Sequence, residues 1–346
     1  MPALAVANAL RAKGALVSFL GTADRAEAEL VPAAGYEIDH LRVRGIDRTN
    51  PMRAAGALAL AARAVPAARA VLRRRQADVV LAGGGYVAAP AGLAALGMRL
   101  PVIVTEADRR LGLANRMLAR RASRVCLAFP IAGRVGERYL VTGRPVPAAI
   151  TTADRAAARK RFGIGADDRC LLVFGGSQGA LSINNAALDA LLRQGRGFEV
   201  LHISGKRDYE MARERVEAAG ASESGRYTLI SYEPGLADAM AASDLALARS
   251  GASVFELAAA GLPAILVPYP YATGRHQHAN AEWMASAGAA VPIEDADLTG
   301  DAVARLAAEI LGDDVRLKRM ADASAALAMP DAADRVADEV MDAVRA

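Results

Sequence analysis

The chain has 346 residues, a length for which about two domains are expected, and hydrophobic residues make up 53% of it, enough for sizeable cores. Its formal net charge is +4, and arginine greatly outnumbers lysine, a balance compatible with a basic face toward phosphates or lipid head groups. Aromatic residues make up only 4% and no recognition module for DNA or RNA is visible, so we expect no nucleic-acid partner.

The N-terminus predicts a helix where an α/β domain usually has a strand. Residues 2–12 have the pattern of an amphipathic helix, with Pro2 in its first turn and Gly14 just past its end, and the run ALVSFLG at 15–21 predicts a buried strand. The pattern of a signal peptide is absent. Doubly wound domains normally begin with a strand whose loop to the first helix often holds the ligand. We therefore expect that strand and loop upstream of Met1, unless the fold starts unusually.

Strands and helices alternate along the rest of the chain, which predicts parallel sheets with helices on both faces. The uncharged window 79–98 has the length of a membrane span, but Gly83–Gly85 and Pro90 favour a strand, a glycine turn and a helix. Cys126 and Cys170 lie in apolar strand-like runs, which predicts buried, reduced thiols. The expected strands are 36–43, 78–83, 101–106, 123–129 and 138–142, then 169–177, 198–205, 227–232, 245–250 and 263–269.

A Pro-rich stretch at 143–156 predicts a linker, and 331–346 predicts a terminal helix. The sequence thus predicts two similar α/β domains that face each other across a cleft. The apolar segment 52–72 lies among many arginines. Any single one has a simpler explanation in the core or in coding bias, but together they predict peripheral contact with an anionic membrane surface. These are Arg42, Arg44, Arg48, Arg53, Arg73, Arg74 and Arg75.

The clearest binding pattern is the glycine-rich turn at 175–179, between a buried strand and a helix. Its glycines let the backbone approach a ligand closely, and the following helix offers free N–H groups. The Ser177 hydroxyl and the Gln178 amide add donors beside Gly179. The turn therefore predicts a diphosphate site, although such turns also occur for packing. It is not a P-loop, because no Gly-Lys-Ser/Thr follows.

A second small-residue turn at 250–253 opens another helix, with Glu256 three residues after Ser253. This spacing alone favours a capping box, while a carboxylate that accepts from ribose hydroxyls is the functional alternative.

A third cluster, Arg275 to Asn280, gathers His276, Gln277 and His278 at a helix start. Amides and imidazoles suit sugar hydroxyls. No Cys or carboxylate group completes a His-x-His metal pair, so no metal is expected.

With these motifs the sequence resembles the MurG family. The similarity lies in GGSQGA at 175–180, in RSGAS at 249–253, and in AAGLPAILVPYPYATGRHQHAN at 259–280. The first half agrees through FLGT, LVPAAGYEI, ADVVLAGGGYVAAP, LGLANRMLARRASRVCLAF and VTGRPV, so the resemblance covers nearly the whole chain. The resemblance implies a GT-B fold of two Rossmann-like domains with parallel sheets and the first strand of the N-domain missing. Residues 1–147 would form the acceptor and membrane-associated domain, 148–330 the UDP-GlcNAc domain, and helix 331–346 would cross back to the first.

The resemblance implies an inverting transfer of N-acetylglucosamine from UDP-GlcNAc to lipid I, giving lipid II for peptidoglycan synthesis, cell shape and cell division at the cytoplasmic face of the cell membrane. No cofactor is implied, and other cell-wall synthesis proteins are possible partners. Glu256 would bind the ribose, which overrides the capping interpretation, and Gln277 with His276 would distinguish the sugar from its epimer. The remaining donor contacts would be Ser177, Gln178, Gly179, Ser253, Asn280, Arg144 and, through backbone near uracil, Ile230.

The acceptor would bind the first domain through two glycine loops. One matches 83–90 here and contains Gly84, Gly85 and Tyr86; the other, GGTGGH, precedes the first helix in the family and carries a candidate base. Because MPALAVA matches the start of that helix, we expect Met1 to be an internal start codon, rather than the chain to be a truncated relative.

Two departures from the family concern the acceptor site and the base. The family's HEQN is Thr105-Glu106-Ala107-Asp108 here, which retains only the carboxylate, and GNPVR is GRPVP at 143–147. Asp108 and Asn115 remain polar acceptor candidates. Glu106 is the remaining candidate general base, and the alternative is a structural carboxylate that orients its loop. Rival functions are a non-catalytic UDP-sugar-binding protein and another GT-B enzyme, such as a UDP-GlcNAc 2-epimerase.

Overall fold

The computed structural model describes residues 2–45, 51–176, 180–192, 197–221, 226–272 and 275–345. They divide into two compact units: unit 1 comprises Met1–Val146 and Asp331–Ala346, and unit 2 comprises Pro147–Pro330. The boundary lies inside the stretch 143–156 that the sequence analysis predicts as a linker. That stretch is partly helical, because it contains α6 (Ala149–Thr152) and overlaps the start of α7 (Arg155–Phe162).

Unit 1 is an α/β structure whose described strands all pair in parallel. β1 and β2 form one sheet, and β3, β4, β5 and β6 form a second sheet in chain order. Among the described residues no strand joins β1 to β3. The elements are α1 (Pro2–Ala12), β1 (Ser18–Gly21), α2 (Glu27–Ala33), β2 (Glu37–His40), α3 (Pro51–Arg74), β3 (Val80–Ala82), α4 (Gly85–Gly97), β4 (Val102–Glu106), α5 (Leu113–Leu118), β5 (Arg124–Leu127), β6 (Tyr139–Val141) and α15 (Ala332–Arg345).

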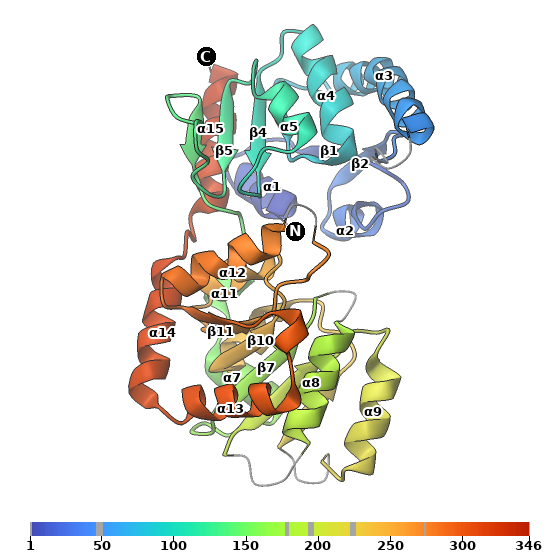
Figure 1. Ribbon diagram of the computed structural model, residues 1–346. Helices are drawn as coiled ribbons and strands as arrows, with labels where there is room; N and C mark the ends of the chain where they lie inside the picture. The colour runs from blue at the N-terminus through green and yellow to red at the C-terminus, as the bar shows by residue number, and fades with distance from the viewer. Residues whose placement is uncertain are drawn as a thin grey trace. The chain divides into compact units, whose positions relative to one another are not determined.

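Two helical layers cover the four-stranded sheet of unit 1 (Figure 1). Ile103 of β4 and Cys126 of β5 pack with α1 and α15 in one buried cluster. Their neighbours Val104 and Leu127 pack in another cluster with α3, α4 and α5. Successive side chains of a strand point to opposite faces, so a parallel sheet covered on both sides needs an apolar residue at each position.

Unit 2 contains one six-stranded parallel sheet in the order β12-β11-β10-β7-β8-β9. Its buried cluster joins Leu171 and Val173 of β7 to Ile183 of α8 and to Val303 of α13. The remaining elements are β7 (Cys170–Phe174), α8 (Leu181–Leu191), β8 (Glu199–Ile203), α9 (Tyr209–Ala218), β9 (Tyr227–Ile230), α10 (Leu236–Ala242), β10 (Leu245–Ala248), α11 (Ser253–Ala259), β11 (Ala264–Leu266), α12 (His276–Ser286), β12 (Ala290–Pro292), the 3-10 helix η2 (Asp295–Asp297), α13 (Gly300–Leu311) and α14 (Asp314–Ala326).

The order of strands in unit 2 reverses beside β7. From β7 the chain adds β8 and β9 on one side, and then returns to the other side of β7 for β10, β11 and β12. In open parallel sheets, ligands bind outside the carboxyl ends of the strands at such a reversal. The topology therefore points to the loops that follow β7 and β10.

The predicted α/β class with parallel sheets is confirmed, as are the N-terminal and C-terminal helices. The uncharged window at 79–98 is β3, a glycine turn and α4, as predicted. Both cysteines are free and buried, and burial raises the pKa of Cys126 to about 12 and that of Cys170 to about 11. The observed strands are shorter than the predicted ones, because apolar side chains continue into the loops beyond the paired residues.

A buried polar network joins α8, β8 and β9 in unit 2. The His202 ring is fully buried; its Nδ1 lies 2.7 Å from Tyr227 Oη, and its Nε2 lies 3.0 Å from Asn184 Oδ1. Asn184 Nδ2 donates to the Ser204 carbonyl (2.9 Å) and to Asp208 (3.0 Å). An amide oxygen only accepts, so His202 carries its proton on Nε2 and accepts from Tyr227.

This network predicts an acid-sensitive fold. Burial lowers the pKa of His202 to about 3, whereas the unfolded chain takes up that proton near pH 6.5. The unfolded state therefore binds more protons between these values, and stability falls as pH falls through this window. In urea unfolding, the wild-type chain should lose about 2 kcal/mol more than His202→Gln between pH 7 and pH 5. An equal loss of unfolding free energy in the two proteins would contradict the lowered pKa of His202.

Candidate functional site

The loops that follow β7 and β10 stand at the strand reversal of unit 2. Gly175 and Gly176 come directly after β7, and Gly176 has a φ of 92°, a conformation that favours glycine. Ser177, Gln178 and Gly179 lie outside the described residues, so their predicted diphosphate contacts stay predictions. Helix α8 begins at Leu181, as expected for a strand, a glycine turn and a helix.

The turn after β10 is hydrogen-bonded to residues of α12. Ser250 is fully buried; its Oγ donates to the Gln277 carbonyl (2.8 Å), and its own carbonyl accepts from Asn280 Nδ2 (3.0 Å). Asn280 also donates to the Gly251 carbonyl (3.4 Å) and is itself buried, at 7% exposure. Its amide is thus engaged with the turn, and the contacts in unit 2 give Asn280 a supporting role.

The capping-box interpretation of Ser253 and Glu256 is wrong. Ala252 is the residue that precedes α11, it lies in the α-helical region of backbone space, and no side chain caps this helix. Ser253 is the first helical residue, and its Oγ donates to the Arg249 carbonyl (3.3 Å) instead. The helix therefore starts one residue earlier than the capping box requires, and Glu256 lies in its first turn.

Gln277 lies next to two loops, the one that contains Tyr269 after β11 and the turn that contains Gly251 after β10. Its Oε1 accepts from the Tyr269 backbone N–H (2.9 Å), and its Nε2 would be 3.7 Å from a Cβ placed on Gly251. Because the oxygen is engaged, any further contact of this amide group would use its N–H donors. His276 is the first residue of α12, and Arg275 before it adopts a left-handed conformation with φ 54°. His278 Nε2 lies 3.1 Å from Glu294, so this histidine is paired with a carboxylate.

Two further donor predictions fall in different places. Ile230 ends β9, the second strand on its side of β7, and its carbonyl accepts from the Ser204 N–H (3.1 Å). That carbonyl therefore already accepts a hydrogen bond from the neighbouring strand end. Arg144 follows β6 and belongs to unit 1, whereas the other predicted donor residues belong to unit 2.

In unit 1, Glu106 organises the loop after β4. It is 7% exposed; Oε1 accepts from the Asp108 N–H (3.1 Å), and Oε2 accepts from the Gly112 N–H (2.8 Å) and from Asn115 Nδ2 (3.0 Å). Asn115 Nδ2 also donates to the Thr105 carbonyl (2.9 Å), while its Oδ1 is buried without a hydrogen-bond partner. These contacts are those of the loop-orienting alternative that the sequence left open. The Asp108 side chain is exposed beside them.

The glycine turn after β3 lies against this cluster. Gly84 and Gly85 have φ values of 83° and 73°, and a Cβ on Gly84 would meet Asn115 Nδ2 at 3.4 Å. Tyr86, in the first turn of α4, is 48% exposed, and its ring lies so close to Gly45 that a Cβ there would clash at 2.6 Å. Gly84, Gly85, Glu106 and Asn115 thus come together at the carboxyl ends of β3 and β4.

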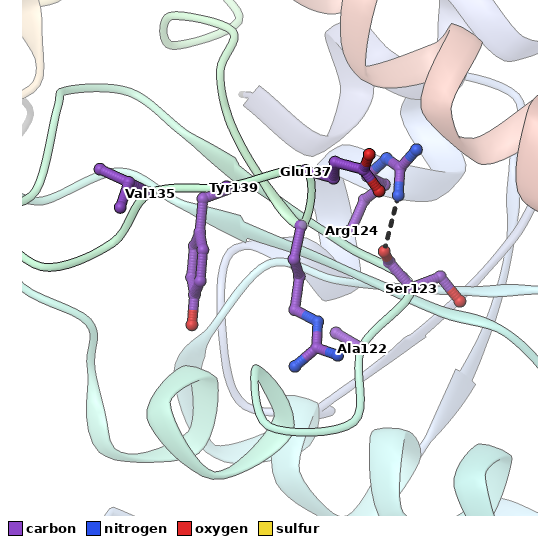
Figure 2. A pocket seen from close by; sticks show the side chains of 8 residues that line it. Ala122, Ser123, Arg124, Val135, Glu137 and Tyr139 are labelled. Carbon is purple, nitrogen blue, oxygen red and sulfur yellow. Dashed lines mark hydrogen bonds between the residues drawn. The ribbon is translucent and has the colours of Figure 1, made fainter.

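Two cavities in the described structure lie at the amino ends of the strands, away from the loops described above. In unit 1, a cavity of about 470 Å³ opens where β5 and β6 begin, between Arg124 and Tyr139 (Figure 2). In unit 2, a cavity of about 430 Å³ opens where β7, β10 and β11 begin. None of the predicted site residues lines either cavity. In the residues that the structure describes, no cluster of His, Cys, Asp and Glu has the makings of a metal site.

The sequence analysis missed Arg249, Ser182 and Asp295. Arg249 Nη2 donates to Ser182 Oγ (2.7 Å), and Nη1 donates to Asp295. The available signal was an arginine directly after the buried strand β10 and directly before the Ser250 turn. Ser182 and Asp295 gave no such signal, because they come close to Arg249 only through the strand order.

Two family models match the chain: the glycosyltransferase family 28 N-terminal domain over residues 1–127 and the C-terminal domain over 170–336. A curated relative from Halorhodospira halophila is 43% identical over 97% of this chain and 92% of its own length. A second curated relative, from Mycolicibacterium paratuberculosis, is 43% identical over 99% of this chain and 85% of its own length. Both are named UDP-N-acetylglucosamine–N-acetylmuramyl-(pentapeptide) pyrophosphoryl-undecaprenol N-acetylglucosamine transferase.

Solved structures are similar over the whole chain. The crystal structure of Acinetobacter baumannii MurG matches with a TM-score of 0.77 at 29% identity, over 99% of this chain and 95% of that one. The UDP-GlcNAc 2-epimerase from Neisseria meningitidis matches with a TM-score of 0.69 at 15% identity, over 98% and 95%, which shows a shared fold alone. The fold is therefore GT-B-like, and the chain belongs to the MurG family of N-acetylglucosaminyltransferases within glycosyltransferase family 28.

Proposed function

We propose that this chain transfers N-acetylglucosamine from UDP-GlcNAc to lipid I, undecaprenyl-diphospho-MurNAc-pentapeptide, and so forms lipid II for peptidoglycan. The observation that supports this best is the strand reversal of unit 2. The two motifs that resemble the family's donor site follow β7 and β10, the strands on either side of the reversal. Residues 147–330 then form the donor domain, and residues 1–146 with α15 the acceptor domain.

In the donor domain, the glycine loop at 175–179 would hold the diphosphate near the start of α8. Free N–H groups at a helix start stabilise the negative charge that grows on the leaving UDP. Glu256 would accept from the ribose hydroxyls, and the Gln277 amide N–H would donate to a sugar hydroxyl, since its oxygen already accepts from Tyr269. These roles follow from the resemblance together with the free donor that the contacts leave.

The reaction is a single displacement at the anomeric carbon. The acceptor hydroxyl oxygen forms a bond to that carbon while the bond to the diphosphate oxygen breaks, and a base takes the hydroxyl proton. UDP leaves with the electron pair, and the configuration at the carbon inverts.

In the acceptor domain, the turn with Gly84 and Gly85 would contact the lipid diphosphate, and Tyr86, Asp108 and Asn115 lie around it. Both oxygens of Glu106 already accept hydrogen bonds from its own loop. We therefore assign Glu106 the loop-orienting role, and the base remains to be identified.

We propose that the enzyme binds to an anionic membrane surface. None of the helices in the described part of the chain is both long and apolar enough to cross a bilayer. The arginines at the end of α3 are less available than predicted, because Arg74 and Arg75 pair with Asp39 of β2. Leu93 of α4 and Leu113 and Met117 of α5 are exposed, and so are Arg116, Arg120 and Arg121 in and just after α5. We propose that α4 and α5 supply the face that contacts the membrane.

A 2-epimerase or a non-catalytic binder would share this fold. An epimerase acts on UDP-GlcNAc without any acceptor, and a binder releases no product at all. The lipid-acceptor features of unit 1 favour the transferase.

Incubation of the full chain with labelled UDP-GlcNAc and a lipid I analogue should give the disaccharide lipid product and UDP. UDP-GlcNAc alone should be recovered unchanged. If an epimer of UDP-GlcNAc formed in the absence of lipid I, that result would support the epimerase instead. UDP binding without any turnover would support the binder, and neither result is expected.

Glu106→Ala should remove three hydrogen bonds from the loop after β4. We expect the KM for lipid I to rise by about tenfold and the KM for UDP-GlcNAc to stay the same. The fall of kcat at low pH should persist in this variant, because Glu106 is not the base. Glu137→Ala, which removes an exposed carboxylate of unit 1 at the opposite ends of the strands, is the matched control. A fall in kcat of about 10²-fold or more with unchanged lipid I KM would instead identify Glu106 as the base.

Replacement of Leu113 and Met117 by serine should weaken sedimentation with vesicles that contain anionic phosphatidylglycerol, because both side chains are exposed on α5. Val315→Ser, which changes an 80% exposed side chain of α14 in unit 2, serves as the control. If both proteins bind vesicles like the wild type, the membrane face lies elsewhere.

A further inference from the structure

Arg249, at the end of β10, ties together four segments of unit 2. Its side chain is only 12% exposed. Nη2 donates to Ser182 Oγ in the first turn of α8 (2.7 Å), and Nη1 donates to Asp295 in η2. Nη1 also reaches the carbonyls of Val267 (3.3 Å) and Pro268 (3.4 Å), which follow β11.

Ser182 and Asp295 are also bonded to each other. Ser182 Oγ donates to Asp295 Oδ1 at 2.8 Å and accepts from Arg249, so the three side chains close a ring. An arginine largely removed from water needs a partner of opposite charge. Among the described residues, Asp295 is the only carboxylate bonded to Arg249. The position of the Arg249 guanidinium therefore depends on Asp295.

The ring is directly connected to the donor loops. Ser182 comes three residues after Gly179, the end of the predicted diphosphate loop. On the other side, Ser250 follows Arg249 and is bonded to Gln277 and Asn280 of α12. The Arg249 guanidinium also lies 5.4 Å from the centre of the Tyr269 ring, and Tyr269 donates to Gln277. The start of α8, the turn after β10 and the start of α12 thus form one connected set.

We propose that Asp295 and Ser182 are positioning residues for the nucleotide sugar. They hold Arg249, and through it they keep the start of α8 and the turns after β10 and β11 in the arrangement that binds UDP-GlcNAc. This inference rests on the proposed function. Without Asp295 these loops spend less time in the binding arrangement, and the apparent Kd rises in proportion to the lost fraction.

The test compares Asp295→Ala, Asp295→Asn and Asp297→Ala in the full chain. Asp297 lies on the same 3-10 helix and is exposed, so it is the matched control. We expect Asp295→Ala to raise the Kd for UDP, measured by calorimetry, and the KM for UDP-GlcNAc about tenfold. KM for lipid I and kcat at saturating donor should not change. Asparagine keeps an oxygen that accepts from both Ser182 and Arg249 but loses the charge, so it should restore part of the affinity.

The proposal is overturned if Asp295→Ala binds UDP like the wild type or like Asp297→Ala. It is also overturned if only kcat or the lipid I KM changes. Ser182→Ala is the second variant should Asp295→Ala fold poorly by thermal unfolding. It should weaken UDP binding in the same direction, and the double variant should lose little more, because both changes break one ring. UDP binding without any transfer by the wild type would reject the proposed function, while the UDP comparison would still test the ring.

Discussion

The reversal of strand order beside β7 is the constraint on which the proposed donor site depends. In a parallel sheet every strand ends at the same edge, and helices that leave neighbouring strands in opposite directions leave a space between their first turns. In unit 2 these are α8 and α11, which follow β7 and β10. A nucleotide diphosphate needs backbone N–H groups and room for close approach. Gly176, with its positive φ, and the buried Ser250 turn stand at the two strand ends where we propose that the diphosphate binds.

In both units a largely buried charged side chain at the carboxyl ends of the strands fixes a loop by hydrogen bonds. In unit 1 it is the Glu106 carboxylate, which accepts from two backbone N–H groups and one amide. In unit 2 it is the Arg249 guanidinium, which donates to two side chains and two carbonyls. Buried charges are costly unless they are paired and hydrogen-bonded. Each therefore holds its loop in one conformation.

The fold class, the parallel pairing and most strands could be predicted from sequence, because apolar runs and glycine turns alternate regularly along the chain. The motifs proposed to bind the donor, among them the Ser250 turn and Gln277, lie in short local patterns that the sequence displays, and their binding roles stay predictions. Glu106 was found, but its role was left open, because its partners Gly112 and Asn115 come from the following loop and helix. The Ser182–Arg249–Asp295 ring could not be found, because its members are far apart in sequence and meet only through the strand order.

The central claim is that UDP binds at the strand reversal of unit 2, and hydrogen–deuterium exchange of the full chain with and without UDP tests it most directly. The account predicts protection of backbone amides in the segments 175–184, 249–257 and 276–281, with little change at the two cavities at the amino ends of the strands. Protection confined to those cavities, or to unit 1, would contradict it.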